Sequence, residues 1–263
     1  MADQTLIAWT DRTANFWIGC VKVSDGCKNC YAEVVAKNRM GLNVWGPAKT
    51  TSRQPVKGIY ANLRAWDRES KEGAVGVRGR GHPHLVFVGS MMDWAEDHPD
   101  LPEIRVKMWE AIRASTHLHF QLLTKRAERI AELLPDFWPQ IRDRVWLGTS
   151  IESMKLAERA DHLRTLDAAV RFISYEPALG PLDQLDLTGI DWVIFGGESG
   201  VGYRAADLDW ARRMRERCEG EGVAFFFKQS SHRYTERGIE LDGEIVRMFP
   251  TPRVTRPRLD LFA

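Results

Sequence analysis

Three cysteines lie within eleven residues near the start of the chain. Cys20, Cys27 and Cys30 follow a C-x6-C-x2-C spacing, and thiolates this close in sequence can share one metal ion or cluster. Structural zinc requires four ligands in a closed tetrahedron, so a fourth would have to come from the distant Cys218 or from a histidine. A [4Fe-4S] cluster held by three cysteines instead leaves one iron open to a ligand. The spacing therefore favours an iron–sulfur cluster over zinc and over unrelated core cysteines.

Polar residues and glycines stand directly after several short apolar segments, where a strand would end. They are Ser90, Asp93, Thr124, Lys125, Ser150, Glu152, Glu176, Gly196, Gly197, Glu198, Lys228 and Gln229. The carboxyl ends of parallel strands meet at one edge of a sheet, so we expect these residues to converge. Any one of them can instead be a cap or turn residue, but the paired glycines favour close approach of the backbone to a ligand.

Apolar segments that alternate with amphipathic ones must position that site. The predicted strands are Leu85–Gly89, His119–Leu123, Val145–Gly148, Val170–Ser174, Trp192–Gly196 and Val223–Phe227. Each is too continuously apolar for a sheet with one face in water, which indicates buried parallel strands. Asp100 and Asp207 are predicted to cap the starts of two intervening helices.

A short first strand at Leu6–Trp9 completes a repeated βα alternation. It predicts a single α/β domain over residues 1–263, a partial or full (β/α) TIM-type barrel of about six to seven parallel strands. A Rossmann-type sheet is disfavoured because no glycine-rich turn follows the first strand. Two segments break the rhythm: a basic insertion at residues 49–80 and an extended tail at residues 249–263, rich in arginine and proline.

The basic insertion carries eight basic residues against three acidic ones and ends in a glycine-rich run. A loop of this composition is expected to be mobile, and it can close over a site as a lid or contact phosphate groups. The tail adds further arginines that can also contact phosphate groups. The alternative for both segments is exposed chain that is kept soluble by its charge.

The composition limits the kind of partner. The chain has 263 residues, 44% of them hydrophobic, and 37 basic residues balance 36 acidic ones to a net charge of +1. No global positive field exists, so any nucleic-acid contact must be local. The amino terminus lacks the regions of a signal peptide and no apolar run is long enough to cross a bilayer, so we expect a cytoplasmic protein without membrane contact. Cysteines there are expected to be reduced.

The residues around the cysteines resemble a known family. The block from Ala8 to Glu33 is similar to the phage-associated three-cysteine-motif proteins of the radical S-adenosylmethionine (radical SAM) superfamily. The similarity continues through FVGSMMD (87–93), LLTKR (122–126), WLGTSIES (146–153), ISYEPALGPL (173–182), DWVIFGGESG (191–200) and FKQ (227–229). The first cysteine gap is longer than the superfamily's usual C-x3-C-x2-C, and Asn29 stands where an aromatic residue is common.

The resemblance implies that Cys20, Cys27 and Cys30 hold a [4Fe-4S] cluster whose open iron binds S-adenosyl-L-methionine. Reductive cleavage of that cofactor gives a 5′-deoxyadenosyl radical, so an electron donor such as flavodoxin or ferredoxin is an implied partner. The residues then expected to bind the cofactor are Tyr31, Ser90, Asp93, Thr124, Lys125, Ser150, Glu176, Gly196 and Gly197. The residues expected to take part in catalysis are Glu152, Glu198 and Lys228. The residues expected to contact substrate are Gln229, Arg78, Arg80, Arg253 and Arg256.

The substrate that the resemblance implies is DNA carrying a modified thymine. A phage enzyme of this group would work in the host cytoplasm as an isomerase in thymidine hypermodification, a DNA modification that serves restriction evasion. It would rearrange an N-linked glycinyl-thymidine to a C-linked form. Two alternatives stay open: a radical SAM enzyme on a free nucleotide, peptide or metabolite, and a zinc-stabilised nucleic-acid-binding module.

Overall fold

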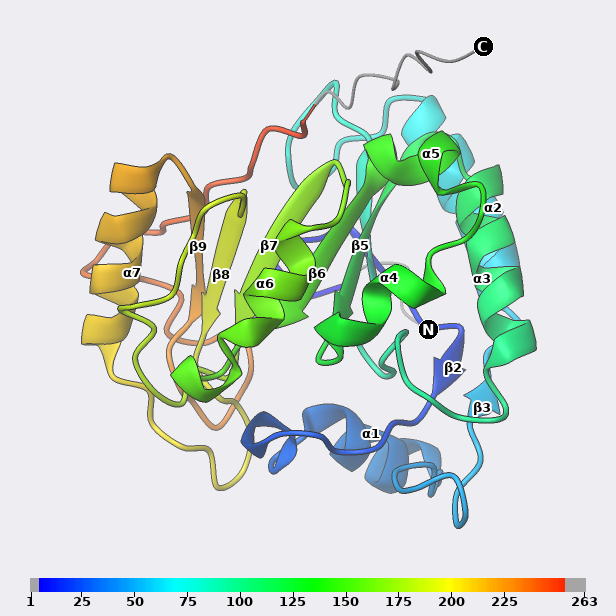
Figure 1. Cartoon of the computed structure of the whole chain (residues 1–263), viewed down its shortest axis with the longest axis horizontal. Helices are drawn as coiled ribbons and strands as arrows, with labels where there is room; N and C mark the ends of the chain where they lie inside the picture. The colour runs from blue at the N-terminus through cyan, green and yellow to red at the C-terminus, as the bar shows by residue number, and fades with distance from the viewer. Residues whose placement is uncertain (1–4, 254–263) are drawn as a thin grey trace.

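A curled sheet of seven parallel strands dominates the computed structural model, which describes residues 5–253 (Figure 1). In order across the sheet the strands are β1 (Arg12–Ala14), β4 (His84–Val88), β5 (Leu118–Thr124), β6 (Val145–Ser150), β7 (Val170–Tyr175), β8 (Trp192–Gly196) and β9 (Ala224–Gln229). Every neighbouring pair is parallel. The sheet forms a half-barrel, which confirms the predicted α/β fold with a partial TIM-type barrel.

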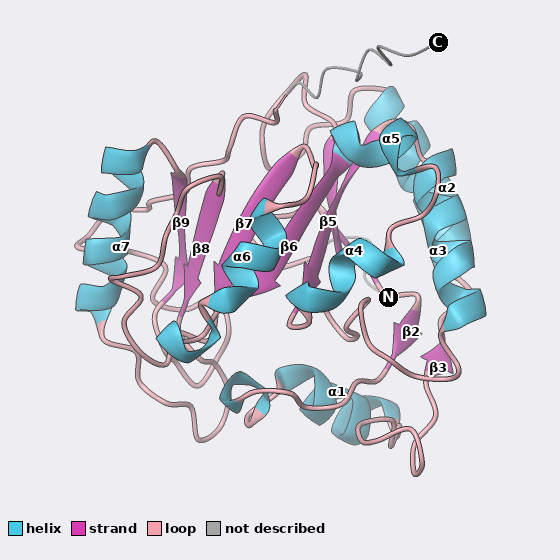
Figure 2. Ribbon diagram, in the orientation of Figure 1, coloured by secondary structure: helices cyan, strands magenta, loops and turns pink. Residues whose placement is uncertain are grey.

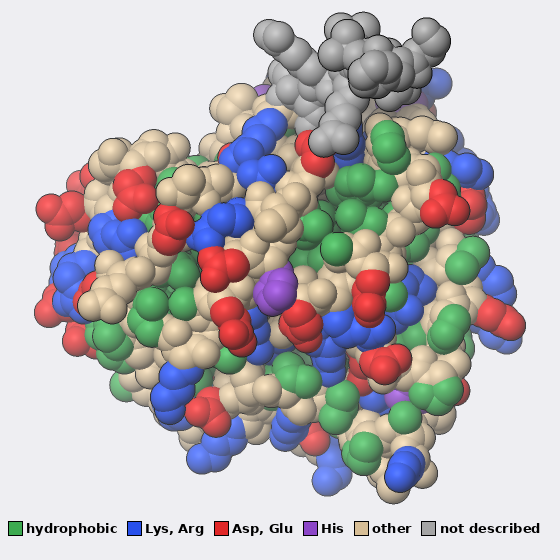
Figure 3. Space-filling view, viewed as in Figure 1, with side chains coloured by type: hydrophobic (Ala, Val, Ile, Leu, Met, Phe, Trp, Pro, Cys, Tyr) green, Lys and Arg blue, Asp and Glu red, His purple; other side chains and the backbone are tan. Residues whose placement is uncertain are grey.

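Helices connect the strands and surround the sheet (Figure 2). They are α2 (Ile59–Lys71), α3 (Pro102–Ala114), α4 (Ile130–Leu133), α5 (Trp138–Ile141), α6 (Glu158–Arg164) and α7 (Leu208–Glu221), with the 3-10 turns η2 (Ala127–Arg129), η3 (Arg142–Arg144) and η4 (Met154–Leu156). No helix within residues 5–253 is both long and apolar enough to cross a membrane. Figure 3 shows acidic and basic side chains interspersed over one face of the molecule, as the balanced charge predicts.

The remaining elements lie beyond the carboxyl ends of the strands, which we call the mouth of the half-barrel. Here α1 (Tyr31–Met40) runs across the strand ends (Figure 1), preceded by the 3-10 turn η1 (Asp25–Cys27). A small antiparallel pair, β2 (Trp17–Ile18) and β3 (Gln54–Pro55), lies at the same end. The cysteines are therefore carried by elements outside the main sheet.

Two apolar clusters sit on the two faces of the sheet, because side chains alternate along each strand. In β4, Val86 and Val88 pack into the large outer core with the helices. Leu85 and Phe87 belong to a second cluster on the inner face, which also contains Trp9 and Trp192. This aromatic cluster fills the half-barrel toward the amino ends of the strands, a region we call the base.

The first strand differs from the prediction of Leu6–Trp9. Those residues precede the sheet, and the parallel pairing starts at Arg12, opposite Val86. The physical reason is Trp9, which is buried with its ring centroid 4.6 Å from that of Phe87. The segment predicted as a strand therefore places the Trp9 indole in the inner cluster at the base and does not pair with the sheet.

The basic insertion at residues 49–80 differs from the continuous loop that the sequence predicted, because it includes a strand and a helix. It contains β3 and α2, and α2 buries Ile59, Leu63 and Trp66 in the outer core. The spacing of these three residues is that of one helix face. The insertion thus supplies the helix that connects β1 to β4.

The two predicted helix caps have different outcomes. Asp207 caps α7 as predicted, since its side chain accepts a hydrogen bond from the backbone N–H of Asp209. Asp100 does not cap α3, whose N-cap is Leu101. The Asp100 carboxylate instead accepts a hydrogen bond of 2.9 Å from the backbone N–H of Arg53, which ties β3 to the start of α3.

Candidate functional site

The cysteine loop, residues 19–30, crosses the mouth between β2 and α1 (Figure 1). It begins at Gly19, whose φ of 122° is in the region that favours glycine. A Cβ there would lie 2.5 Å from the Val44 carbonyl oxygen. Cys27 ends η1 and Cys30 is the N-cap residue of α1. Local turn chemistry therefore brings the thiols to the end of the barrel where the strand-end motifs also lie.

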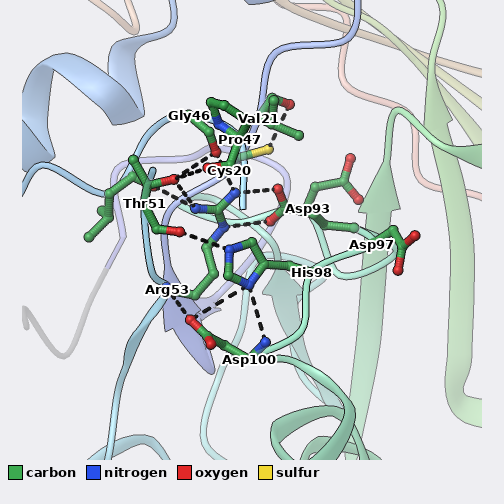
Figure 4. Close-up of polar contacts among 12 residues, drawn as sticks. Cys20, Val21, Gly46, Pro47, Thr51, Arg53, Asp93, Asp97, His98 and Asp100 are labelled. Carbon is green, nitrogen blue, oxygen red and sulfur yellow. Dashed lines mark hydrogen bonds and ion pairs between the residues drawn. The ribbon is translucent and has the colours of Figure 1, made fainter. Parts of the chain in front are cut away.

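Cys20 lies beside an ion pair between Asp93, which follows β4, and Arg126, which follows β5. Arg126 Nη1 is 3.9 Å from the Cys20 sulfur and 2.6 Å from Asp93 Oδ2, while its Nη2 donates to the Val21 carbonyl oxygen at 3.0 Å. Figure 4 shows Cys20 and Asp93 on neighbouring segments. Burial, followed by the charges of Asp93 and Glu96, raises the pKa of the Cys20 thiol far above its usual range.

The second and third cysteines have neighbours that contact buried carboxylates. Ser24 Oγ is 3.8 Å from Cys27 Sγ and donates to Glu152 Oε1 at 2.7 Å. Asn29, which directly precedes Cys30, donates from Nδ2 to Glu198 Oε2 at 2.9 Å. Two predicted catalytic residues thus contact the cysteine loop itself.

Cations compensate both carboxylates. Glu152 has a side chain only 2% exposed and pairs with Lys125 at 2.8 Å and Arg159 at 3.1 Å. Burial disfavours its charge, but these cations outweigh burial and hold the pKa of Glu152 below its usual range. For Glu198 burial again opposes ionisation, and hydrogen bonds from Arg204 lower its pKa. Both groups are therefore carboxylates at neutral pH.

Several predicted cofactor residues bind one another in this structure. Asp93 accepts from the Thr124 hydroxyl and, at 3.1 Å, from the backbone N–H of Lys125. Ser90 Oγ accepts from Asn15 at 2.7 Å, and the Ser90 carbonyl oxygen accepts from the Tyr31 hydroxyl at 2.8 Å. These contacts place the predicted residues together at the mouth. They also show that Asp93 and Thr124 organise the loop after β5.

The end of β9 carries a further charged pair, with a carboxylate that follows β7. Lys228 Nζ is 2.6 Å from Glu176 Oε1. A Cβ on Gly196 would lie 2.7 Å from the Glu176 carboxyl carbon, and one on Gly197 would lie 2.3 Å from the backbone nitrogen of Ser231. The paired glycines therefore make room for parts of this chain, where the sequence predicted room for a cofactor.

Two further predicted residues are engaged with the backbone. Ser150 is buried, and its carbonyl oxygen accepts from Arg159 at 2.7 Å. Gln229 is buried as well, donating to the Gly197 carbonyl oxygen at 3.1 Å and accepting from the backbone N–H of Glu236 at 2.6 Å. Gln229 thus braces the chain after β9, which differs from its predicted contact with substrate.

The predicted substrate arginines do not share a site with the cysteines. Arg78 lies over the Trp146 ring at 5.3 Å and donates to the Pro83 carbonyl oxygen, both at the base, and the exposed Arg80 follows on the same loop. Arg253 pairs at 2.7 Å with Asp191, the residue directly before β8. A residue that precedes a strand lies at its amino end, away from the mouth. Arg256 lies outside the described residues.

Sequence reasoning missed several charged residues at the mouth. Arg126 directly follows the predicted Lys125 and could have been found from that motif, whereas Arg159 and Arg204 follow no recognisable pattern. Glu236 lies after β9 with φ at 56°, and burial raises its pKa, with Lys228 opposing and Glu176 adding to the shift. No sequence signal marks Glu236.

A fully buried ion pair stands behind the first cysteine. Arg53 and Glu96 have side chains 0% exposed and are joined at 2.6 Å. Arg53 also donates to the Gly46 carbonyl oxygen at 2.9 Å, and the Gly46 N–H donates to the Cys20 carbonyl oxygen at 3.0 Å. Figure 4 shows Arg53 with Thr51, His98 and Asp100. This network fixes residues 44–53 beside Cys20.

The fit of a metal centre can be judged from the donors. Cys20, Cys27 and Cys30 are free thiols on one loop at the mouth. Within the described part of the chain, no three or more His, Cys, Asp or Glu side chains gather as a metal-binding group. Thiols are nevertheless the donors that an iron–sulfur cluster requires, and three on one loop match its needs in number and position. The donor set fits, while the thiols in this structure are not gathered around a common point.

Comparison with known proteins gives a family. The chain belongs to the family described as "Protein of unknown function (DUF5131)", whose model matches residues 4–250. No curated protein and no solved structure matches the chain. The match covers the half-barrel and the cysteine loop together.

Proposed function

We propose that the protein is a radical SAM enzyme in which Cys20, Cys27 and Cys30 hold a [4Fe-4S] cluster. The observation that carries the proposal is the position of the cysteine loop across the mouth of a curled parallel sheet. Barrel enzymes assemble their sites from residues at the carboxyl ends of their strands. Three thiols within eleven residues at that end supply the donors for such a cluster.

The chemistry that the bound cluster and S-adenosyl-L-methionine supply is formation of a 5′-deoxyadenosyl radical, which abstracts a hydrogen atom. The chain's own residues bind and orient. Lys125 and Lys228 bring cationic ammonium groups to the mouth from the ends of β5 and β9, 2.8 Å and 2.6 Å from their carboxylate partners. Such groups can bind a carboxylate of cofactor or substrate by exchanging one partner for another.

One proton can move within the chain at the end of β9. The Lys228 ammonium lies at hydrogen-bond distance from Glu176, and the charges of both act on the pKa of the half-buried Glu236. Because burial favours the neutral form of Glu236, its pKa lies above the usual range and this carboxyl holds a proton more readily than an exposed glutamate does. In the proposed function this carboxyl would serve as the acid for steps that need a proton.

The proposed substrate remains thymine-modified DNA, with the reaction an isomerisation of N-linked to C-linked glycinyl-thymidine. This part rests on the family resemblance, since Arg78 and Arg253 lie at the base and supply no phosphate contact at the mouth. A free nucleotide, peptide or metabolite is the second candidate, because the balanced charge of the chain requires no polyanion. A flavodoxin or ferredoxin as electron donor and a reducing compartment such as the cytoplasm belong to the same proposal.

A zinc-stabilised nucleic-acid-binding module is the competing class. It requires a fourth zinc ligand beside the three cysteines, and Cys218 is buried on α7 in the outer core. Anaerobic reconstitution separates the two classes. Stoichiometric zinc without iron–sulfur absorption would favour the module.

The test of the activity is reductive cleavage of S-adenosyl-L-methionine. Reconstituted protein, dithionite and the cofactor are incubated without oxygen, and 5′-deoxyadenosine is quantified by mass spectrometry. We expect product from the parent and from Cys218→Ala, and none from Cys27→Ala. Absence of product from parent protein that carries a full cluster would refute the proposal. Addition of modified DNA or free nucleoside, followed by nucleoside analysis, then separates the substrate candidates.

A further inference from the structure

Each cysteine of the loop lies next to, or within three residues of, a residue that is bonded to a buried charged side chain at the end of a strand. Arg126 follows β5 and contacts the segment of Cys20, Glu152 follows β6 and contacts that of Cys27, and Glu198 follows β8 and contacts that of Cys30. Three different strand ends thus reach three successive parts of one loop.

The contact with Glu152 is the tightest of the three. Its Oε1 accepts from Ser24 Oγ at 2.7 Å, and the Cys27 N–H donates to the Ser24 carbonyl oxygen at 2.9 Å. A Cβ on Gly26 would lie 2.4 Å from the same carboxylate oxygen. The loop therefore lies directly against Glu152, and a side chain at position 26 would collide with that carboxylate.

Glu198 is held in the same manner from the other side of the mouth. Arg204 donates to it from Nε at 2.9 Å and from its backbone N–H at 2.8 Å. Asn29 then joins Glu198 to the Gly202 carbonyl oxygen, at 2.9 and 3.0 Å. Since Asn29 is the neighbour of Cys30, these bonds set where α1 begins.

Arg126 completes the set at the first cysteine. Its Nη2 donates to the Val21 carbonyl oxygen at 3.0 Å, and its Nη1 is fixed by Asp93 at 2.6 Å. Both side chains of this pair are 8% exposed. A charge-assisted hydrogen bond to the backbone beside Cys20 restrains that residue more strongly than a neutral one would.

We infer that Arg126, Glu152 and Glu198 are positioning residues that fix the spacing of the three thiols by fastening the loop to the ends of β5, β6 and β8. This replaces the catalytic role predicted for Glu152 and Glu198. The inference rests on the proposed function for its purpose, because a shared cluster needs its thiols at a defined separation. The contacts themselves predict how fast each thiol is alkylated in protein that contains no iron.

The test measures the alkylation rate of each cysteine by iodoacetamide, in the cluster-free full chain, with peptide mass spectrometry. Ser24→Ala and Asn29→Ala remove the loop side of two contacts and leave the buried carboxylates paired with their cations. We expect Ser24→Ala to raise the rate at Cys27 by about tenfold and Asn29→Ala to raise that at Cys30 similarly, the factor lost with one hydrogen bond to a charged group. Cys218 should stay unreactive in both.

Two further variants separate positioning from general stability. Glu198→Gln keeps an oxygen that can accept from Asn29, so it should leave Cys30 near its parental rate, whereas Glu198→Ala should raise that rate. Asp183→Ala, which breaks a 3.0 Å surface pair with Arg213, is the matched control and should change no cysteine. Unchanged rates at Cys27 and Cys30 in the loop variants, or equal rises that include Cys218, would overturn the inference.

Failure of the positioning inference can be distinguished from failure of the proposed function. Iron content and the electron paramagnetic resonance spectrum of reconstituted parent and Ser24→Ala protein are recorded in parallel. If the parent assembles no cluster while the alkylation rates change as expected, the proposed function fails and the positioning inference stands. If the parent assembles a cluster and the rates do not change, the positioning inference alone fails.

Discussion

The mouth and the base of the half-barrel are built from opposite kinds of residue. At the base, Trp192 makes edge or tilted contacts with the rings of Trp9, Trp146, Phe172 and Phe226, with centroids 5.8 to 6.1 Å apart. At the mouth, carboxylates and cations pair around a loop of cysteines. The base therefore buries aromatic rings, whereas the mouth buries charged side chains.

The difference indicates where stability and function reside. Aromatic side chains bury large areas and contribute strongly to folding. Buried ion pairs recover little of the free energy that desolvation costs, so several of them at one end are poor evidence of a stabilising role. We therefore expect substitutions at the base to lower the free energy of unfolding. Substitutions at the mouth should change the reactivity of the thiols, and should lower stability strongly only where they leave a buried charge unpaired.

The largest effect on stability is expected from Trp192→Ala. Removal of a fully buried indole leaves a cavity, so the free energy of unfolding should fall by about 3–5 kcal/mol. Urea unfolding measures this loss. The alkylation rates of the three loop cysteines should stay at their parental values in the folded variant. A loss under about 1 kcal/mol would remove the distinction between the two ends.

Arg53→Met is expected to have the next largest effect. It leaves the fully buried Glu96 carboxylate without its cation, so unfolding should become easier by about 3 kcal/mol. Because Arg53 holds the Gly46 segment beside Cys20, that thiol should also react faster. The double variant Arg53→Met with Glu96→Leu should regain part of the lost stability in urea. A double variant less stable than Arg53→Met would contradict this account.

His119 connects stability at the base to pH. Burial lowers its pKa to about 4, with Arg78, Arg144 and His82 adding to the shift. The unfolded state therefore takes up a proton first as the pH falls below 6.5, and stability declines between that value and about 4. At pH 5 this group should lower the free energy of unfolding by about 1–2 kcal/mol relative to pH 7. His119→Gln should reduce the difference in the free energy of unfolding between pH 7 and pH 5, measured by urea titration. A difference as large as in the parent would show that His119 is not its source.

The smallest effect is expected from Arg253→Ala at the base. Its pair with Asp191 is partly exposed, so the loss of stability should be about 0–1 kcal/mol. Formation of 5′-deoxyadenosine and affinity for DNA should match the parent, because the residue lies away from the mouth. A selective loss of either, with stability retained, would show that the base takes part in the reaction.

The sequence predicted the half-barrel and the place of the cysteines because both depend on local patterns. Continuous apolar segments such as Val145–Gly148 mark buried strands, and polar residues that follow them must lie at the mouth. The same rule, applied to residues that precede a strand, would have placed Arg78 at the base. The helical spacing of Ile59, Leu63 and Trp66 would likewise have identified α2. Arg253 follows the last strand and lies at the base through its pair with Asp191, which no local pattern marks.

Other features depend on contacts between distant segments. Ser24 meets Glu152 across 128 positions, and Asn29 meets Glu198 across 169 positions. Nothing in the local sequence distinguishes a carboxylate that holds a loop from one that acts on a substrate. Gly196 shows the same limit, since a glycine that accommodates Glu176 and a glycine that accommodates a cofactor have the same sequence signature.

The most direct test of the central claim is the iron content of protein reconstituted without oxygen. Parent protein and Cys218→Ala should each bind about four iron atoms per chain, the content of one [4Fe-4S] cluster, with matching visible absorption. Cys20→Ala, Cys27→Ala and Cys30→Ala should each lose the cluster while urea unfolding shows a folded chain. Parent protein that binds no iron, or a cluster that depends on Cys218, would contradict the account.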